Sequence, residues 1–67
     1  MRTGNKVRAV REIEGGWTTP SVPAGSKGVI VQASPFFDRY TVTFTNQGLL
    51  GGTVTLKNVS GADLQRW

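Results

Sequence analysis

The chain contains neither cysteine nor histidine among its 67 residues. It therefore forms no disulfides and lacks the ligands of the commonest zinc sites, and we expect no metal and no cofactor. A catalytic base would have to come from lysine or from the four Asp and Glu residues, of which Glu12 and Glu14 read as a solvated strand end. These absences disfavour an enzyme.

Long apolar runs are also missing. No stretch approaches the roughly 18 apolar residues that a membrane-spanning helix requires. Residues 1–6 are basic, but no apolar segment of the kind found in secretory signals follows them. We therefore expect one domain over residues 1–67, located in the cytoplasm, with no membrane association.

Helical periodicity is absent too, and the chain is instead divided by turns. Nine glycines and three prolines separate short segments rich in Val, Thr, Ile, Phe and Tyr. In residues 39–45, Tyr40, Val42 and Phe44 alternate with polar residues, which predicts a strand with one buried face. Further strands are expected at residues 6–12, 28–33 and 53–57, with a glycine-rich connection at 46–52.

The C-terminal residues 58–67 predict one helical turn, capped by Ser60 or Asp63, followed by a short closing strand. The side chains expected to share the single apolar core are Val7, Val29, Tyr40, Val42, Phe44, Val54, Leu56 and Leu64.

Two segments resemble the small bacterial proteins with SH3-like barrels. TGNKVRAV (residues 3–10) is similar to the family's G-D-x-V-R start, with Asn5 in place of Asp, and VPAGSKGVIV (22–31) is similar to its V-P-x-G-x-x-G-x-V second strand. The layout is also similar to the KOW-type barrels of ribosomal and transcription proteins. The resemblance implies an all-β, SH3-like barrel of about five strands with one short helical turn near the C-terminus. It carries over no functional residue, and it implies that Gly28 is needed where a bent strand leaves no room for a Cβ.

The same resemblance leaves a small oligomeric enzyme as an alternative, because the type II dihydrofolate reductases are SH3-like barrels. Their Val-Gln-Ile-Tyr run has no counterpart here, since residues 31–34 read Val-Gln-Ala-Ser. We expect a non-catalytic binding module instead.

Aromatic residues in loops and at the chain end are the candidate protein-binding residues: Trp17, Phe36, Phe37 and Trp67. SH3-like folds bring the first long loop close to the loop before the third strand, so Trp17, Phe36 and Phe37 are expected to form an exposed apolar patch. The alternative is that these rings cover the core or plug one end of the barrel. The patch would dock a protein partner or a second copy, giving a homo-oligomer.

A net charge of +4 supports a second binding function. The candidate nucleic-acid-binding residues are Arg2, Lys6, Arg8, Arg11 and Lys27, of which Lys6 and Arg8 share the outward face of the first strand. The alternative is a charged strand that only prevents aggregation. Protein docking is slightly favoured from the sequence, because exposed aromatic rings are costly to keep in water without a use.

Overall fold

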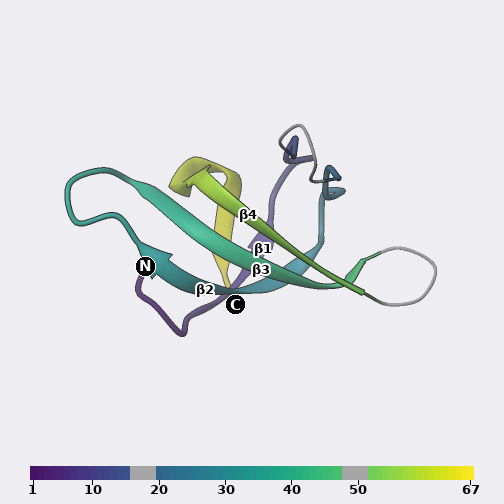
Figure 1. Cartoon of the computed structure of the whole chain (residues 1–67), viewed down its shortest axis with the longest axis horizontal. Helices are drawn as coiled ribbons and strands as arrows, with labels where there is room; N and C mark the ends of the chain where they lie inside the picture. The colour runs from purple at the N-terminus through teal and green to yellow at the C-terminus, as the bar shows by residue number, and fades with distance from the viewer. Residues whose placement is uncertain (16–19, 48–51) are drawn as a thin grey trace.

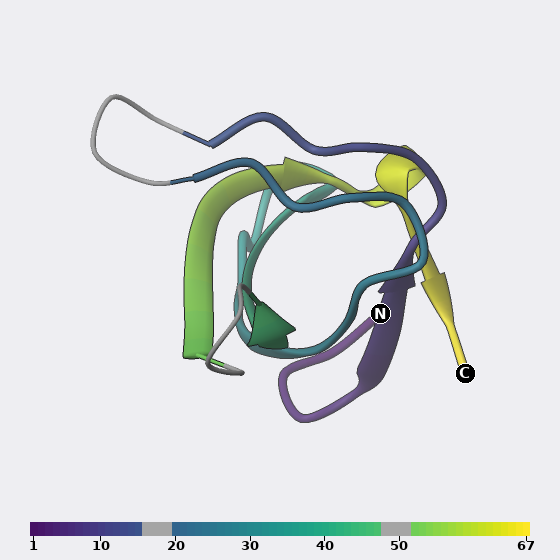
Figure 2. The same ribbon diagram turned by 90° about the vertical axis from the view of Figure 1, so that its right-hand side faces the viewer.

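Five antiparallel strands form one sheet in the computed structural model, which describes residues 1–15, 20–47 and 52–67. The strands are β1 (Lys6–Ala9), β2 (Lys27–Ala33), β3 (Arg39–Gln47), β4 (Gly52–Ser60) and β5 (Leu64–Arg66), arranged in the order β4-β3-β2-β1-β5. The sheet twists strongly and coils around one core (Figures 1 and 2). The prediction of an all-β, SH3-like barrel is confirmed.

One 3-10 turn, η1 (Gly61–Asp63), joins β4 to β5 and is the only helical element within the described ranges. The Ser60 hydroxyl accepts a hydrogen bond from the Ala62 N–H at 3.3 Å, so Ser60 is the N-cap. Leu64 then re-enters the core, as predicted. Across the described part of the chain, no helix has the length and apolar content to cross a membrane.

The turn before β1 explains why the chain enters the sheet at Lys6. The Asn5 N–H donates to the Arg2 carbonyl at 3.0 Å, and the Asn5 side chain accepts from the Arg2 N–H at 2.7 Å. Residues 2–5 thus form a β-turn, and Gly4, its third residue, has the positive φ (+92°) that a type II turn requires there. Asn5 therefore closes this turn through both its backbone and its side chain.

Among the described residues, the core contains ten buried apolar side chains: Val7, Ala9, Ile13, Val22, Ile30, Val42, Phe44, Leu56, Val59 and Leu64. Ile13 and Val22 come from the long connection between β1 and β2. They reach the core because their backbones form a bridge with two N–H to carbonyl hydrogen bonds of 2.9 Å.

Three of the predicted core positions need correction. Val29 is 37% exposed, and its neighbour Ile30 is fully buried in its place. The reason is that Gly28 faces inward between Val7 and Phe44, so alternation along β2 directs Ile30 inward as well. Tyr40 and Val54 are only half-buried at the margin of the core.

The boundaries of β1, β3 and β4 differ from the predicted ones. β1 ends at Ala9 rather than Glu12. The next N–H, that of Val10, bonds the Asp63 carbonyl at 2.9 Å, and this is the last β1–β5 bond because Asp63 already belongs to η1. β3 and β4 are longer than predicted, and they pair as far as Gln47 and Gly52. Residues 48–51 of the predicted glycine-rich connection lie outside the described residues.

Two β-bulges flank Thr41 of β3, one in each neighbouring strand. On one side, Ile30 pairs with Val42 but Gln32 pairs with Thr41, so β2 carries one extra residue. On the other side, three steps along β4 oppose two along β3, and Asn58 adopts a φ of 59° there. Bulges increase local bending and twist, which helps so short a sheet to coil.

Candidate functional site

Three of the predicted nucleic-acid-binding residues meet on the outer face of β1 and β2. Alternation along β1 buries Val7 and leaves Lys6 and Arg8 exposed on the other side. Arg8 pairs directly with Lys27 of β2. Side chains opposite each other in an antiparallel pair have Cβ atoms about 5 Å apart, so these cations are close neighbours.

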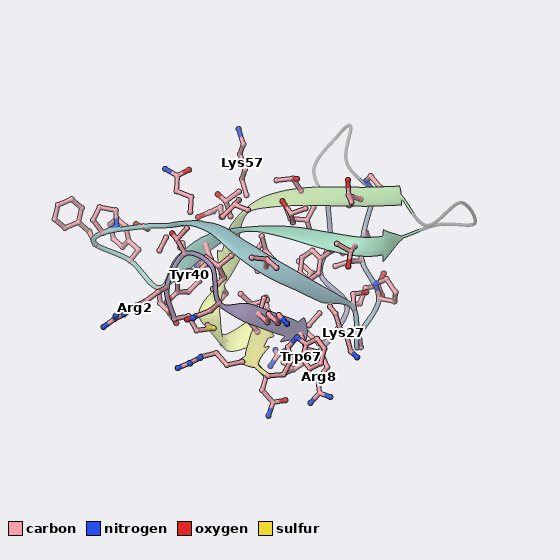
Figure 3. All side chains as sticks on the ribbon, turned by 90° about the horizontal axis from the view of Figure 1, so that it is seen from below. Arg2, Arg8, Lys27, Tyr40, Lys57 and Trp67 are labelled. Carbon is pink, nitrogen blue, oxygen red and sulfur yellow. The ribbon has the colours of Figure 1, made fainter. Side chains whose placement is uncertain are left out.

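Trp67 joins this group from the far edge of the sheet. Its N–H donates to the Lys6 carbonyl at 3.2 Å, which continues the β1–β5 ladder. The Lys27 ammonium nitrogen lies 4.1 Å from the centroid of the Trp67 ring, a cation–π contact. The ring is still 58% exposed. Figure 3 shows Arg8, Lys27 and Trp67 gathered together. We call Lys6, Arg8, Lys27 and Trp67 the basic face.

Across the described part of the chain, no ion pair joins the basic face to a carboxylate. Arg8 donates to the neutral Gln65 side chain at 2.7 Å, and Lys27 faces a neutral ring. Within the described residues, the one ion pair is that of Arg11 with Asp63, 3.2 Å apart on η1 and the adjoining loop. Like charges directly opposite in a sheet are destabilising, so the Arg8–Lys27 pair is unfavourable unless an anion binds.

The other predicted cations are not part of this group. Arg11 is engaged by Asp63. Arg2 lies in the turn before β1, and Figure 3 shows it apart from Trp67. Lys57 of β4 lies on a different side of the molecule from Lys27 and Trp67 (Figure 3).

The predicted aromatic residues also separate into different regions. Phe36 and Phe37 are 86% and 72% exposed in the connection between β2 and β3, so neither ring plugs the barrel. Trp67 contacts Lys27 at the opposite end of β2, a span of roughly 20 Å at about 3.3 Å per residue. Trp17 lies outside the described residues. The described arms of its loop lie at the other end of the molecule from the β2–β3 connection (Figure 1).

Beside Phe37, the Tyr40 hydroxyl donates a hydrogen bond to the Asp38 carboxylate, and this bond raises the pKa of Tyr40. Desolvation and the negative charge of Asp38 act in the same direction. In the part of the chain that the structure describes, no cluster of three or more Asp and Glu side chains is placed to hold a metal.

Sequence reasoning predicted Trp67 as a protein-binding residue and missed its contact with Lys27. The two residues are 40 positions apart (67 minus 27), and they meet only because β1 lies between β2 and β5. The sequence pointed to this site only through the alternation of β1, which places Lys6 and Arg8 on its outward face.

Comparison of the chain with protein-family models, with curated protein sequences and with solved structures finds no match.

Proposed function

We propose that this chain is a non-catalytic binding module that holds single-stranded nucleic acid on the basic face. The observation that carries the proposal is the placement of the Lys27 ammonium 4.1 Å from an exposed tryptophan ring, next to Lys6 and Arg8. Cations that follow a phosphate backbone, combined with a ring on which a base can stack, are the usual means of binding single strands. A cytoplasmic location, expected from the sequence, fits this partner.

A single strand fits the basic face better than a duplex, because the Trp67 ring can stack only on a base that is not already stacked on its neighbours. The +4 net charge favours approach of any polyanion. Lys6, Arg8 and Lys27 offer three phosphate contacts, which predicts a log–log salt slope of roughly −2 at about −0.7 per contact on single strands.

Fluorescence anisotropy of a labelled single-stranded oligonucleotide tests this proposal across a salt series. Lys27→Ala should weaken binding and make the salt slope less steep by about 0.7. Lys57→Ala is the matched control, because it removes the same charge from an exposed strand position away from the basic face. Equal effects of the two substitutions would mean that only net charge matters, and the proposal would then be wrong.

The contribution of Trp67 is measured in the same assay. Trp67→Ala should weaken binding by about fivefold or more, which corresponds to loss of one stacked base, and Trp67→Phe should restore part of it. If Trp67→Ala binds as tightly as the unmodified chain, the contact with Lys27 has no role in binding.

A second candidate function is protein docking through Phe36 and Phe37, including docking onto a second copy. It is supported by the exposure of the two rings, 86% and 72%, in one short connection. Sedimentation at increasing protein concentration tests self-association directly. Replacing both phenylalanines with serine should abolish a dimer, whereas Val10→Ser, at an apolar position 45% exposed elsewhere, should not. A protein that stays monomeric at all concentrations would contradict the prediction of a homo-oligomer.

A further inference from the structure

A pocket of about 310 Å³ opens next to the β2–β3 connection, at the other end of β2 from Lys27. This volume lies at the lower end of the range found for small-molecule sites, about 300–1,000 Å³. The lining side chains that bear on its chemistry are Gln32, Phe37, Arg39, Tyr40, Thr41 and Asn58. None of these residues belongs to the basic face.

The two β-bulges are what bring these polar side chains together. Gln32 follows the extra residue of β2, and Asn58 lies within the bulge of β4, so one carboxamide comes from each side of Thr41. Bulges redirect side chains out of the regular alternation and occur often beside binding sites. Asn58 is the only non-glycine residue with positive φ in the described ranges, and asparagine tolerates that conformation.

The chemistry of the lining matches a nucleobase. A carboxamide offers a donor and an acceptor side by side, and Asn or Gln can bond both polar atoms on one edge of adenine. Phe37 supplies an exposed ring for stacking, at 72% exposure. The exposed Arg39 guanidinium suits a phosphate, and no described carboxylate forms an ion pair with it.

Asp38 is the carboxylate nearest to this region in sequence, and it bonds Tyr40 at the margin of the pocket rather than Arg39. Its backbone carbonyl accepts from the Gly61 N–H at 3.0 Å, and its carboxylate accepts from the Tyr40 hydroxyl. It does not line the pocket. Because no described carboxylate forms an ion pair with Arg39, its positive charge is left to attract an anionic group.

We propose that the pocket between the two bulges binds an unpaired adenine base, with Gln32 and Asn58 reading its edge, Phe37 stacking on its ring and Arg39 contacting its phosphate. The inference rests on the proposed function, because Lys27 and Gln32 are five residues apart on β2, roughly 16 Å, and one strand can reach both sites. The same chemistry would accept a free adenine nucleotide, so the test includes both sources.

The test combines two measurements on the full chain. The first is an NMR titration of ¹⁵N-labelled protein with adenosine monophosphate, with cytidine monophosphate as the counter-probe. The second compares the affinities of oligo(dA) and oligo(dC) of equal length. We expect adenosine monophosphate to shift the amide signals of Gln32, Thr41 and Asn58, and oligo(dA) to bind at least about fivefold more tightly than oligo(dC).

Asn58→Gly is the decisive variant, because glycine keeps the positive φ of the bulge while its lack of a side chain removes the carboxamide. It should abolish the preference for oligo(dA) while leaving binding of oligo(dC) unchanged. The neighbouring Lys57→Ala variant is the control, since Lys57 does not line the pocket. Persistence of the full preference for oligo(dA) in Asn58→Gly would overturn the proposal.

The outcomes separate this proposal from the proposed function. Equal binding of the two oligonucleotides, sensitive to Lys27→Ala, overturns the adenine pocket and leaves the basic face intact. Shifts with adenosine monophosphate but no oligonucleotide binding support the pocket, with a free nucleotide as its ligand, and contradict the proposed function. If adenosine monophosphate causes no shift but raising the protein concentration shifts the same signals, the pocket belongs to an interface between copies and the proposal is wrong.

Discussion

Replacing Gly28 with alanine tests how closely β2 passes over β3. Gly28 faces inward between Val7 and Phe44. A Cβ at this position would lie 2.6 Å from the Thr43 carbonyl oxygen, 3.0 Å from the Phe44 ring and 3.1 Å from the Phe44 Cα. Two of these three neighbours are backbone atoms, so rotating a side chain cannot relieve the contact and β3 itself must move.

Two opposing effects set the expected magnitude. Where the backbone can accept alanine, replacing glycine stabilises a protein by about 0.4–1 kcal/mol, because the unfolded chain loses freedom. Forcing an extra methyl group into a packed interior costs about 1–3 kcal/mol. The net expectation is a loss of about 1–2 kcal/mol from a domain whose total stability is only about 3–5 kcal/mol. The melting temperature should fall by roughly 4–8 °C per kcal/mol.

Urea and thermal unfolding followed by circular dichroism measure this change. Gly4→Ala serves as a comparison, because nothing lies within 4 Å of its Cβ and only the strain of a φ of +92° contributes. A double-mutant cycle with Phe44→Leu identifies the obstacle. Little coupling is expected if the Thr43 oxygen limits the approach, and strong coupling if the ring does. A Gly28→Ala protein as stable as the unmodified chain would refute the reasoning.

Four further substitutions test three features: the pKa of Tyr40, the cap of η1 and the register of β2. Asp38→Asn should return the Tyr40 pKa toward 10.0, seen by phenolate absorbance. Because the pKa of Tyr40 is higher in the folded than in the unfolded chain, the interaction of Tyr40 with Asp38 stabilises the fold fully below about pH 10. This stabilisation is lost as the pH rises through the folded-state pKa. Asp38→Asn should therefore make the stability of the protein less dependent on pH in this range. Ser60→Ala should lower the free energy of unfolding by about 0.5–1 kcal/mol through loss of the cap, measured in urea. Ile30→Ala should cost about 2–5 kcal/mol and Val29→Ala about 0.5, whereas equal losses would contradict the register of β2.

The fold was largely predictable because its main signals are local. Alternation of Tyr40, Val42 and Phe44 identified β3 and the direction of its faces, and the Gly4–Asn5 turn marked the start of β1. The run Val29, Ile30 and Val31 has no alternation, and the choice of Val29 as the core residue was wrong. Had the close approach at Gly28 been used to place that residue inward, Ile30 would have followed two positions later.

Long-range pairing explains what could not be predicted. Ile13 and Val22 enter the core only through a bridge between two arms of a connection that has no strand signal of its own. The grouping of Trp67 with Lys27 requires both the β1–β2 and the β1–β5 registers to be known. A one-residue change in either register would turn the side chains to the opposite face, so the basic face depends on geometry that no local pattern encodes.

The bulges have the same origin as the barrel itself. A sheet of five short strands must bend sharply to enclose its core, and extra residues opposite Thr41 provide part of that bend. The same extra residues direct Gln32 and Asn58 into one pocket. Shape and recognition are nevertheless separable at Asn58, because the bend depends on its backbone φ of 59° and recognition depends on its carboxamide. Asn58→Gly should therefore leave the free energy of unfolding within about 0.5 kcal/mol of its original value while removing base discrimination. A large loss of stability would show that the side chain itself holds the bulge.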